Sequence, residues 1–242
     1  MMADKVALVT GAGRGIGLEV CRQLAERGMT VILTARDLEK AKAAAEQLVG
    51  EGLDVISKTL DVSNDESVHG LAAELEQEFG ILDVLVNNAA AYTDWSEMAS
   101  SADLELAQGV LETNLFGAWR ACQVFLPLIG RSGHGRIVNV SSGAGSHGEP
   151  WFGLTTNRVS AASYSISKAA LNALTAKLAA ELEGTGVLVN AVDPGLTATA
   201  PGIEDIGARP VAEGAASVVW GATLPDSGPT GGFFRDGELL PW

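Results

Sequence analysis

The chain is short of cysteine, histidine and basic charge. Its two cysteines, Cys21 and Cys122, stand far apart and fit no metal-binding or redox spacing, and its three histidines are scattered, so we expect no metal site. The 16 Lys and Arg residues are outnumbered by 30 Asp and Glu residues. The formal charge of −14 argues against a general nucleic-acid or anionic-membrane surface, although it does not exclude a local basic pocket.

The sequence also lacks long apolar runs, linkers and internal repeats. No stretch approaches the roughly 18 apolar residues that a membrane span needs. The first residues lead into a short apolar strand, Val6 to Val9, without a signal-peptide pattern, so we expect a cytoplasmic protein. Because 47% of the residues are hydrophobic and no boundary is visible, we expect one domain over residues 1–242.

A glycine-rich loop follows the first expected strand, Lys5 to Thr10. It runs from Gly11 to Gly17 and is followed by apolar residues at helical spacing. Glycines let a backbone approach a pyrophosphate closely, and a helix N-terminus supplies amide donors for it. The loop therefore predicts a nucleotide site, although its spacing is G-x3-G-x-G and not the dinucleotide fingerprint G-x-G-x-x-G.

The second expected strand, Met29 to Ala35, ends beside a cation. An acidic residue at this point would bind the ribose 2′-hydroxyl of a dinucleotide, but Arg36 stands there. A guanidinium binds a 2′-phosphate as a charge-assisted fork, and Arg14 can approach the same phosphate. We therefore predict NADP(H) over NAD(H); a solvated loop charge is the simpler alternative for Arg36. Asp37 is interpreted as the N-cap of a helix from Leu38 to Gly50.

Two more strand ends carry candidate ligand contacts. The strand from Asp54 to Leu60 ends at Asp61-Val62, where the carboxylate either accepts from an adenine amino group or caps a helix from Ser63 to Phe79. The strand from Leu82 to Val86 runs into Asn87-Asn88-Ala89-Ala90. Small residues there let a ligand lie against the backbone, and the amides can tie neighbouring strands together.

The stretch from Ser163 to Lys168 has the clearest chemical character. Apolar residues follow it at helical spacing, so Tyr164 and Lys168 lie one turn apart on one helix face. A free tyrosine pKa of about 10 is too high for efficient acid–base catalysis, and a nearby ammonium lowers it. The pair predicts a proton donor at Tyr164. Taken alone, it is also typical of a solvated helix face.

Asn114 and Ser142 are further candidates. Asn114 lies inside an expected helical region, Leu104 to Ile129, although asparagine is a poor helix former. Either it is exposed, or the helix kinks there so that its carbonyl group faces the active site. Ser142 follows a strand from Arg136 to Val140, where open α/β sheets bind ligands, although serine pairs are also common in turns.

Strands and helices continue to alternate to the end of the chain. The remaining expected segments are a loop at Gly143–Ala162, the end of the Tyr164 helix near Gly184–Gly186, a strand at Val187–Val192, a helix at Pro210–Leu224, a strand at Gly231–Arg235 and an apolar tail at Leu239–Trp242. This alternation predicts an α/β fold of the Rossmann type: a doubly wound parallel sheet of about seven strands with helices on both faces.

Over nearly its whole length the chain resembles the short-chain dehydrogenase/reductase family. The matching positions are Thr10-Gly11-x3-Gly15-x-Gly17, Asn87-Asn88-Ala89, Asn114, Ser142, Tyr164-x3-Lys168 and Asn190-x3-Pro194-Gly195-x3-Thr199. Three segments resemble the NADPH-dependent carbonyl reductase branch: Leu33 to Asp37, Leu82 to Asn88 and Gly231 to Phe234. The resemblance implies a cofactor half at roughly residues 1–135 and a catalytic half at roughly 136–242.

The resemblance implies a role for each catalytic residue. Tyr164 protonates a carbonyl oxygen as nicotinamide hydride reaches the carbon, and Ser142 hydrogen-bonds that oxygen. Lys168 holds the nicotinamide ribose and lowers the tyrosine pKa, and Asn114 positions a water that relays protons between Lys168 and solvent. The implied cofactor contacts are Gly11, Arg14, Gly15, Ile16, Gly17, Arg36, Asp61, Val62, Asn88, Ala89, Tyr164, Lys168, Pro194, Gly195, Thr197 and Thr199.

The chain departs from the family pattern in two places. Ala90 stands where glycine is frequent, and the added methyl group would crowd the cofactor slightly. The spacing from Ser142 to Tyr164 is longer than in compact members and shorter than in branch members with a large insertion. It leaves monomer, dimer and tetramer open.

We expect NADPH-dependent reduction of a small-molecule ketone or aldehyde. Trp95, Trp151 and Phe152, with the segment after Gly195, suggest an apolar or aromatic substrate. One alternative is an NAD-dependent alcohol dehydrogenase, which Arg36 opposes. Another is a non-catalytic NADP-binding sensor, which would be expected to lack one of the four catalytic residues.

Overall fold

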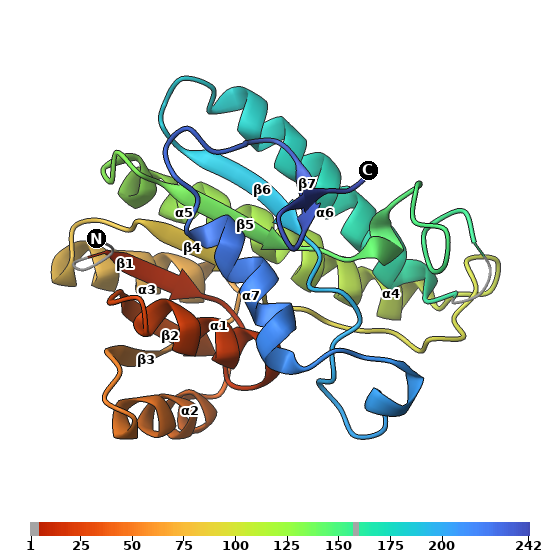
Figure 1. Cartoon of the computed structure of the whole chain (residues 1–242), viewed down its shortest axis with the longest axis horizontal. Helices are drawn as coiled ribbons and strands as arrows, with labels where there is room; N and C mark the ends of the chain where they lie inside the picture. Colours follow the sequence, from red (N-terminus) through yellow and green to blue (C-terminus); the bar gives the residue numbers. More distant parts are fainter. Residues whose placement is uncertain (1–4, 157–159) are drawn as a thin grey trace.

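The computed structural model describes residues 5–156 and 160–242 and shows a sheet between two layers of helices (Figure 1). The sheet has the strand order β3-β2-β1-β4-β5-β6-β7-β8, in which the first seven strands in sequence run parallel. The strand order reverses between β1 and β4, which is where doubly wound sheets bind ligands. The expected Rossmann-type fold is confirmed.

The first seven strands lie within two residues of their expected bounds, and the eighth was not expected. They are β1 (Val6–Val9), β2 (Thr30–Ala35), β3 (Val55–Thr59), β4 (Val84–Asn87), β5 (Arg136–Val140), β6 (Leu188–Val192), β7 (Phe233–Arg235) and β8 (Glu238–Leu239). Strands β1, β4, β5 and β6 are buried along their whole length, as expected for parallel strands covered on both faces.

The eighth strand corrects the expected apolar tail. Strand β8 pairs antiparallel with β7 through a turn at Asp236 and Gly237, both of which have a positive φ (54° and 83°). An Asp-Gly pair with this geometry is a strong hairpin signal, and the sequence contained it. The tail therefore begins by returning along the sheet.

The helices form two apolar layers. They are α1 (Gly15–Ala25), α2 (Leu38–Gly50), α3 (Asp65–Glu78), α4 (Leu104–Leu111), α5 (Ala118–Gly130), α6 (Ala162–Glu181) and α7 (Val211–Ala222). Helices α1, α2 and α7 cover one face of the sheet, and α3, α5 and α6 cover the other. Alternate strand residues serve the two layers: Ala7 and Val9 point to the first, Val6 and Leu8 to the second.

The helical region around Asn114 is interrupted. A π-helical turn at Glu112–Gly117 separates α4 from α5. Asn114 is buried in this turn with 1% of its surface exposed, so exposure is the wrong explanation and the expected local distortion is confirmed. Such turns are frequent at functional sites.

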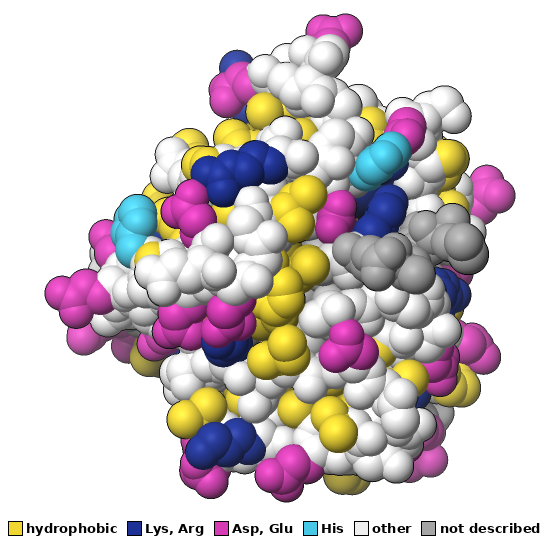
Figure 2. Space-filling view, turned by 90° about the vertical axis from the view of Figure 1, so that its left-hand side faces the viewer, with side chains coloured by type: hydrophobic (Ala, Val, Ile, Leu, Met, Phe, Trp, Pro, Cys, Tyr) yellow, Lys and Arg dark blue, Asp and Glu magenta, His cyan; other side chains and the backbone are white. Residues whose placement is uncertain are grey.

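The surface carries mixed charge. On the face shown in Figure 2, Lys and Arg side chains stand among Asp, Glu and apolar groups. Within residues 5–156 and 160–242, no helix is long and apolar enough to cross a bilayer. In the same part of the chain, no group of three metal-ligating side chains comes together.

Candidate active site

The glycine loop, residues 11–17, packs closely against the end of β4, and we call it the cradle. Gly11 and Gly15 have φ values of +63° and +61°, which favour glycine. A side-chain carbon on Gly11 would lie 2.7 Å from Ala89 Cα, and one on Gly17 would lie 2.4 Å from Asn88 Nδ2. These glycines are therefore required by close packing of the loop on β4.

The start of α1 is open to an anion. Its N-cap residue, Arg14, makes no side-chain capping bond, so the first amide donors of the helix are not satisfied by a cap. Ile16, in the first turn, packs against the core. A helix N-terminus beside a glycine cradle suits a pyrophosphate group, which carries the charge that these donors favour.

The asparagine segment ties the loop to the sheet. Asn88 Nδ2 donates to the carbonyl oxygens of Thr10 and Gly11, at 2.9 and 3.1 Å. Thr10 Oγ1 accepts from the backbone N–H groups of Asn88 and Ala89. The expectation that the amides connect neighbouring strands is confirmed. Direct cofactor contacts by Asn88 and Ala89 stay predictions.

Two exposed arginines stand at the edge of the cradle. Arg14 and Arg36 have no ion-pair partner among the described residues. The loop reaches the end of β2, because a side-chain carbon on Gly13 would lie 3.4 Å from Ala35 Cβ and 3.9 Å from Lys40 Cβ. Lys40 thus adds a third basic residue that the sequence analysis missed.

The two acidic residues near the cradle serve local turns. Asp37 Oδ1 accepts from the backbone of Glu39 and Lys40, so it is the N-cap that was expected. Asp61 is not the cap of α3. It accepts from Ser63, and Asn64 caps the helix instead. An adenine contact by Asp61 stays a prediction.

Val62 fits closely against the π-helical turn. It is buried, and a side-chain carbon on Gly117 would lie 2.6 Å from Val62 Cγ2. Its carbonyl oxygen accepts from Arg120 Nη1 at 2.6 Å. The end of β3 is thereby fixed against the start of α5, while the predicted cofactor contact of Val62 is untested.

Ser142, Tyr164 and Lys168 come together at the ends of β5 and α6. The Tyr164 hydroxyl forms a hydrogen bond with Ser142, and Lys168 Nζ lies 5.5 Å from the centre of the tyrosine ring. Lys168 Nζ also donates to the carbonyl oxygen of Val140 at 2.8 Å. Tyr164 is 7% and Lys168 is 2% exposed, so a solvated helix face is the wrong explanation for this pair.

The protonation of this cluster differs from the expectation. Burial raises the pKa of Tyr164; the Tyr92 and Asp193 side chains add to this, and the hydrogen bond with Ser142 opposes it. Burial lowers the pKa of Lys168 to about 8, against the charge of Asp193. The prediction that Lys168 lowers the pKa of Tyr164 is therefore wrong for the cofactor-free protein, because burial has the largest effect on the pKa of both groups. Tyr164 carries its proton at neutral pH.

Asn114 joins the catalytic helix to the loop after β4. Its Oδ1 accepts from Ala91 N at 2.7 Å, and its Nδ2 donates to Ala91 O and Ser167 Oγ at 2.9 and 3.0 Å. Ser167 Oγ donates in turn to Tyr164 O at 2.7 Å. Both side-chain N–H donors of Asn114 are thus occupied by protein. The water relay stays a prediction.

A segment that we call the strap, residues 91–97, crosses the start of α6. The Tyr92 ring stacks on the Tyr164 ring at 5.2 Å between centres, and Trp95 meets it edge-on at 6.0 Å. Of the predicted substrate residues, Trp95 therefore lies against Tyr164. Trp151 and Phe152 lie in the loop after Ser142, and their substrate contacts are untested.

The strap also supplies the cap of α6. The N-cap residue Ala161 has a strained φ of +32° and no capping side chain. Glu97 Oε2 instead accepts from Ser163 N and Oγ at 2.6 and 2.7 Å. Burial acts to raise the pKa of Glu97, but the hydrogen bonds outweigh it and the pKa is lowered. An uncapped helix start in the sequence is a weak signal for such a distant partner.

The segment after β6 approaches both parts of the site. Gly195 has a φ of +70°, and Thr197 Oγ1 donates to the carbonyl oxygens of Pro194 and Gly195. Thr199 Cγ2 lies 3.6 Å from the position of a side-chain carbon on Gly15. The predicted nicotinamide segment therefore adjoins the glycine loop.

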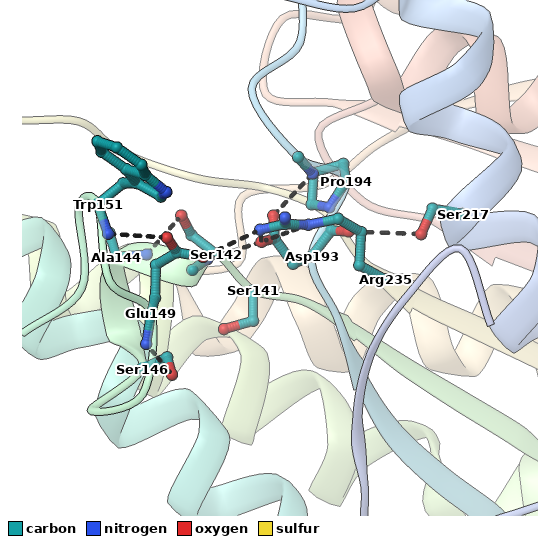
Figure 3. A network of polar contacts seen from close by, with 12 residues as sticks. Ser141, Ser142, Ala144, Ser146, Glu149, Trp151, Asp193, Pro194, Ser217 and Arg235 are labelled. Carbon is teal, nitrogen blue, oxygen red and sulfur yellow. Dashed lines mark hydrogen bonds and ion pairs between the residues drawn. The ribbon is translucent and has the colours of Figure 1, made fainter. Parts of the chain in front are cut away.

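Asp193 was missed by the sequence analysis. It is 3% exposed, and its carboxylate accepts from Gly143 N, Gly195 N and Arg235, as Figure 3 shows for the Arg235 side. Asp193 and Arg235 are 42 positions apart, and no spacing pattern connects them.

The family of the chain follows from its match to a family model. Residues 5–205 match the family model of the short chain dehydrogenases. The chain belongs to the short-chain dehydrogenase/reductase family. It is therefore an oxidoreductase.

Individual members of the family are similar over most of the chain. Short-chain dehydrogenase/reductase 1 of Saponaria officinalis is 34% identical, covering 98% of this chain and 96% of its own. A putative ketoacyl reductase of Streptomyces coelicolor is 39% identical, covering 81% and 72%. A crystal structure of actinorhodin polyketide ketoreductase with NADPH is 30% identical, with a TM-score of 0.83 and coverage of 98% and 97%.

Proposed function

We propose that this short-chain dehydrogenase/reductase uses NADPH to reduce a ketone or aldehyde to an alcohol. The observation that carries the proposal is the buried cluster in which Tyr164 bonds to Ser142 with Lys168 beside the ring. A phenol that keeps its proton at neutral pH suits the donor in a reduction. Ketoreductases among the similar proteins support the same direction.

The residues present fit an NADPH molecule. The cradle and the uncapped start of α1 suit the pyrophosphate, and the exposed, unpaired Arg14 and Arg36 suit the 2′-phosphate. We assign the nicotinamide ribose to Tyr164 and Lys168, and the nicotinamide end to the segment from Pro194 to Thr199. When bound, NADPH supplies the hydride; the protein orients it.

Each catalytic side chain then has a defined task. Tyr164 donates its proton to the carbonyl oxygen, and Ser142 donates a hydrogen bond to the same atom, which stabilises the developing charge. Lys168, with a pKa of about 8, carries an ammonium at neutral pH that can return a proton to the phenolate. Asn114 fixes the strap and α6 relative to each other.

We propose that the substrate is a planar, apolar carbonyl compound and that Tyr92 and Trp95 form one wall of its site, which we call the substrate wall. Tyr92 and Trp95 are 60% and 57% exposed although they lie against Tyr164, so their outer faces are free to take a ring. Tyr92 also lines a cavity of about 530 Å³, whose lining includes the apolar Met98 and Leu106 together with polar and acidic strap residues. Aromatic rings prefer such stacked and edge-on surroundings.

The test is NADPH oxidation across a panel of aromatic and aliphatic aldehydes and ketones. We expect turnover by the wild type and a loss of on the order of a hundredfold or more in Tyr164→Phe, because a general acid is removed. NADPH titration should show that the variant still binds the cofactor, with a loss of affinity no larger than that of the one ribose contact of Tyr164, which controls for misfolding. Equal activity of the two proteins would refute the assignment of Tyr164.

Two further measurements address the alternatives. Tighter binding of NADH than of NADPH would favour the NAD-dependent alcohol dehydrogenase. In Tyr92→Ala, the KM for aromatic ketones should rise while that for small aliphatic ketones stays unchanged. An equal effect on both classes would contradict the proposed substrate wall.

A further inference from the structure

The carboxylate of Asp193 joins the two turns that flank the reacting centre. Its Oδ2 accepts from Gly143 N, the residue after Ser142, at 2.9 Å. Its Oδ1 accepts from Gly195 N at 2.7 Å, at the start of the nicotinamide segment. One buried side chain therefore sets the distance between the Ser142 turn and the Gly195 turn (Figure 3).

Arg235 on β7 holds this carboxylate in place. Its Nε and Nη2 donate to Asp193 Oδ2 at 3.2 and 2.5 Å, and Nη2 lies 3.6 Å from Glu149 Oε2 in the loop after Ser142. A planar guanidinium fixes both the position and the orientation of its acceptors. Figure 3 shows Arg235 between Asp193 and Glu149.

The rest of the C-terminal segment supports the same loop. Ser146 Oγ donates to Pro241 O at 2.8 Å, and His147 N donates to Trp242 O at 2.9 Å. The Trp242 ring stacks on Phe233 of β7 at 5.9 Å. We call residues 233–242 the C-terminal brace. It lies beyond residue 205, where the match to the family model ends.

We propose that Arg235 is a positioning residue for proton transfer: through Asp193 it holds the Ser142 and Gly195 turns in register around the substrate carbonyl. This inference rests on the proposed reductase function. Misplacement of catalytic groups by about 1 Å can cost on the order of a hundredfold in rate, so the brace acts on turnover even though it touches no reacting atom.

The charge of Asp193 also acts on the catalytic pair. It raises the pKa of both Tyr164 and Lys168, and Arg235 is the cation paired with it. Among the described residues, the other ionisable groups facing this network are Glu149, Asp236 and Tyr92. Loss of Arg235 leaves the negative charge of the buried Asp193 carboxylate without its paired cation, whereas Asp193→Asn removes the negative charge itself. The two substitutions therefore change the field at Tyr164 in opposite directions.

The first test compares Arg235→Gln with Arg235→Lys and Arg136→Gln. Arg136 is a matched control, since it is a buried arginine paired with Asp226 at the opposite end of β5. We expect kcat to fall about tenfold or more in Arg235→Gln, with KM for NADPH nearly unchanged, and partial recovery in Arg235→Lys. Arg136→Gln should lower the melting temperature with kcat unchanged. Unchanged kcat in folded Arg235→Gln would overturn the proposal.

The second test is the pH profile of alcohol oxidation by NADP⁺. The acid limb, which reports ionisation of the catalytic acid, should move to higher pH in Arg235→Gln and to lower pH in Asp193→Asn, each by roughly half a unit or more. A purely structural role would move both variants in the same direction or neither. Such a result would refute the charge argument and leave Arg235 an ordinary fold contact.

The third test does not need turnover. In hydrogen–deuterium exchange of the cofactor-free protein, Arg235→Gln should lose protection in residues 141–149 and 193–199, while residues 30–59 keep it. Unchanged protection of residues 141–149 and 193–199 would refute the proposed role of Arg235 and the C-terminal brace. If the wild type reduces no carbonyl compound but exchange changes as expected, the proposed function fails and the coupling of the two turns stands.

Discussion

The predicted nucleotide end and the predicted catalytic end of the candidate site are built by different means. At the nucleotide end, the close contacts are made by backbone and by the absence of side chains, as at Gly11 and Gly17 against the end of β4. At the predicted catalytic end, polar side chains from three separate segments meet: the half-buried Ser142, the buried Tyr164 and Lys168 of α6, and the buried Asp193.

This difference decides what each end tolerates. The nucleotide end should be damaged by added volume, because its contacts have no room for a methyl group. The catalytic end should be damaged by a changed charge or a lost hydrogen bond, because its groups are buried and depend on one another. The following experiments test this contrast, beginning with the largest expected effect.

Gly17→Ala should lower the free energy of unfolding by about 2–3 kcal/mol, because the methyl group meets Asn88 Nδ2 and the backbone of Ala12. NADPH affinity should fall with it. Gly70→Ala in α3 is the matched control: nothing lies within 4 Å of its added carbon, so stability should stay equal or rise. Equal behaviour of the two variants in urea unfolding would contradict a tightly packed cradle.

Lys168 should make the stability of the cofactor-free protein depend on pH. Its folded pKa of about 8 lies below the ordinary 10.5, so between these values the unfolded chain binds more protons and stability rises with pH. From about pH 7.5 to about pH 9.5, wild type should gain on the order of 2 kcal/mol relative to Lys168→Met.

The control for this measurement is Lys177→Met, a lysine of the same helix with 77% of its side chain exposed. Urea unfolding at the two pH values should show no such gain of wild type over this variant. If both variants gave the same pH dependence as wild type, the ammonium of Lys168 would not be destabilised by burial.

Arg36→Ala should raise the dissociation constant for NADPH about tenfold, because a charge-assisted contact to the 2′-phosphate is lost. The affinity for NADH should stay unchanged. Arg27→Ala, which removes another exposed arginine that donates to Gln23 O, serves as the control in the same titration. Equal loss for both cofactors would show that Arg36 does not read the 2′-phosphate.

Glu97→Gln should lower the free energy of unfolding by about 0.5–1 kcal/mol at neutral pH, because the neutral amide is a weaker acceptor for Ser163 at the start of α6. The lowered pKa of Glu97 means that its contribution is present above the unfolded pKa and is lost as the pH falls through the folded pKa. Urea unfolding at neutral and acidic pH measures both effects. If the difference in stability between wild type and Glu97→Gln grew on acidification, the assignment of Glu97 as the cap of α6 would be refuted.

The same contrast explains what could be predicted from the sequence. The glycine loop, the strand ends and the pair of Tyr164 and Lys168 lie within short stretches whose spacing reflects the geometry directly. The strap and the network of Asp193 and Arg235 join segments that are distant in sequence, and their pairing depends on the completed sheet. Tyr92, Glu97 and Arg235 therefore could not be assigned before the structure was known.

Burial was the other quantity that the spacing did not reveal. The i and i+4 relation placed Lys168 beside Tyr164 correctly, but the direction of the tyrosine pKa depends on how much water reaches the pair. Because both side chains are buried, dehydration outweighs their attraction. In the same way, the sequence indicated a distortion at Asn114 but not that its donors would be used by Ala91 and Ser167.

The C-terminal brace has a consequence for how the enzyme comes into being. Residues 233–242 leave the ribosome after the strands β1 to β6 and their helices, yet they contact the loop that follows Ser142. A nascent chain can therefore assemble the nucleotide cradle while translation is still under way, but its catalytic turn gains its support only after the brace emerges. Support of the Ser142 turn is therefore a late step in the synthesis of this chain.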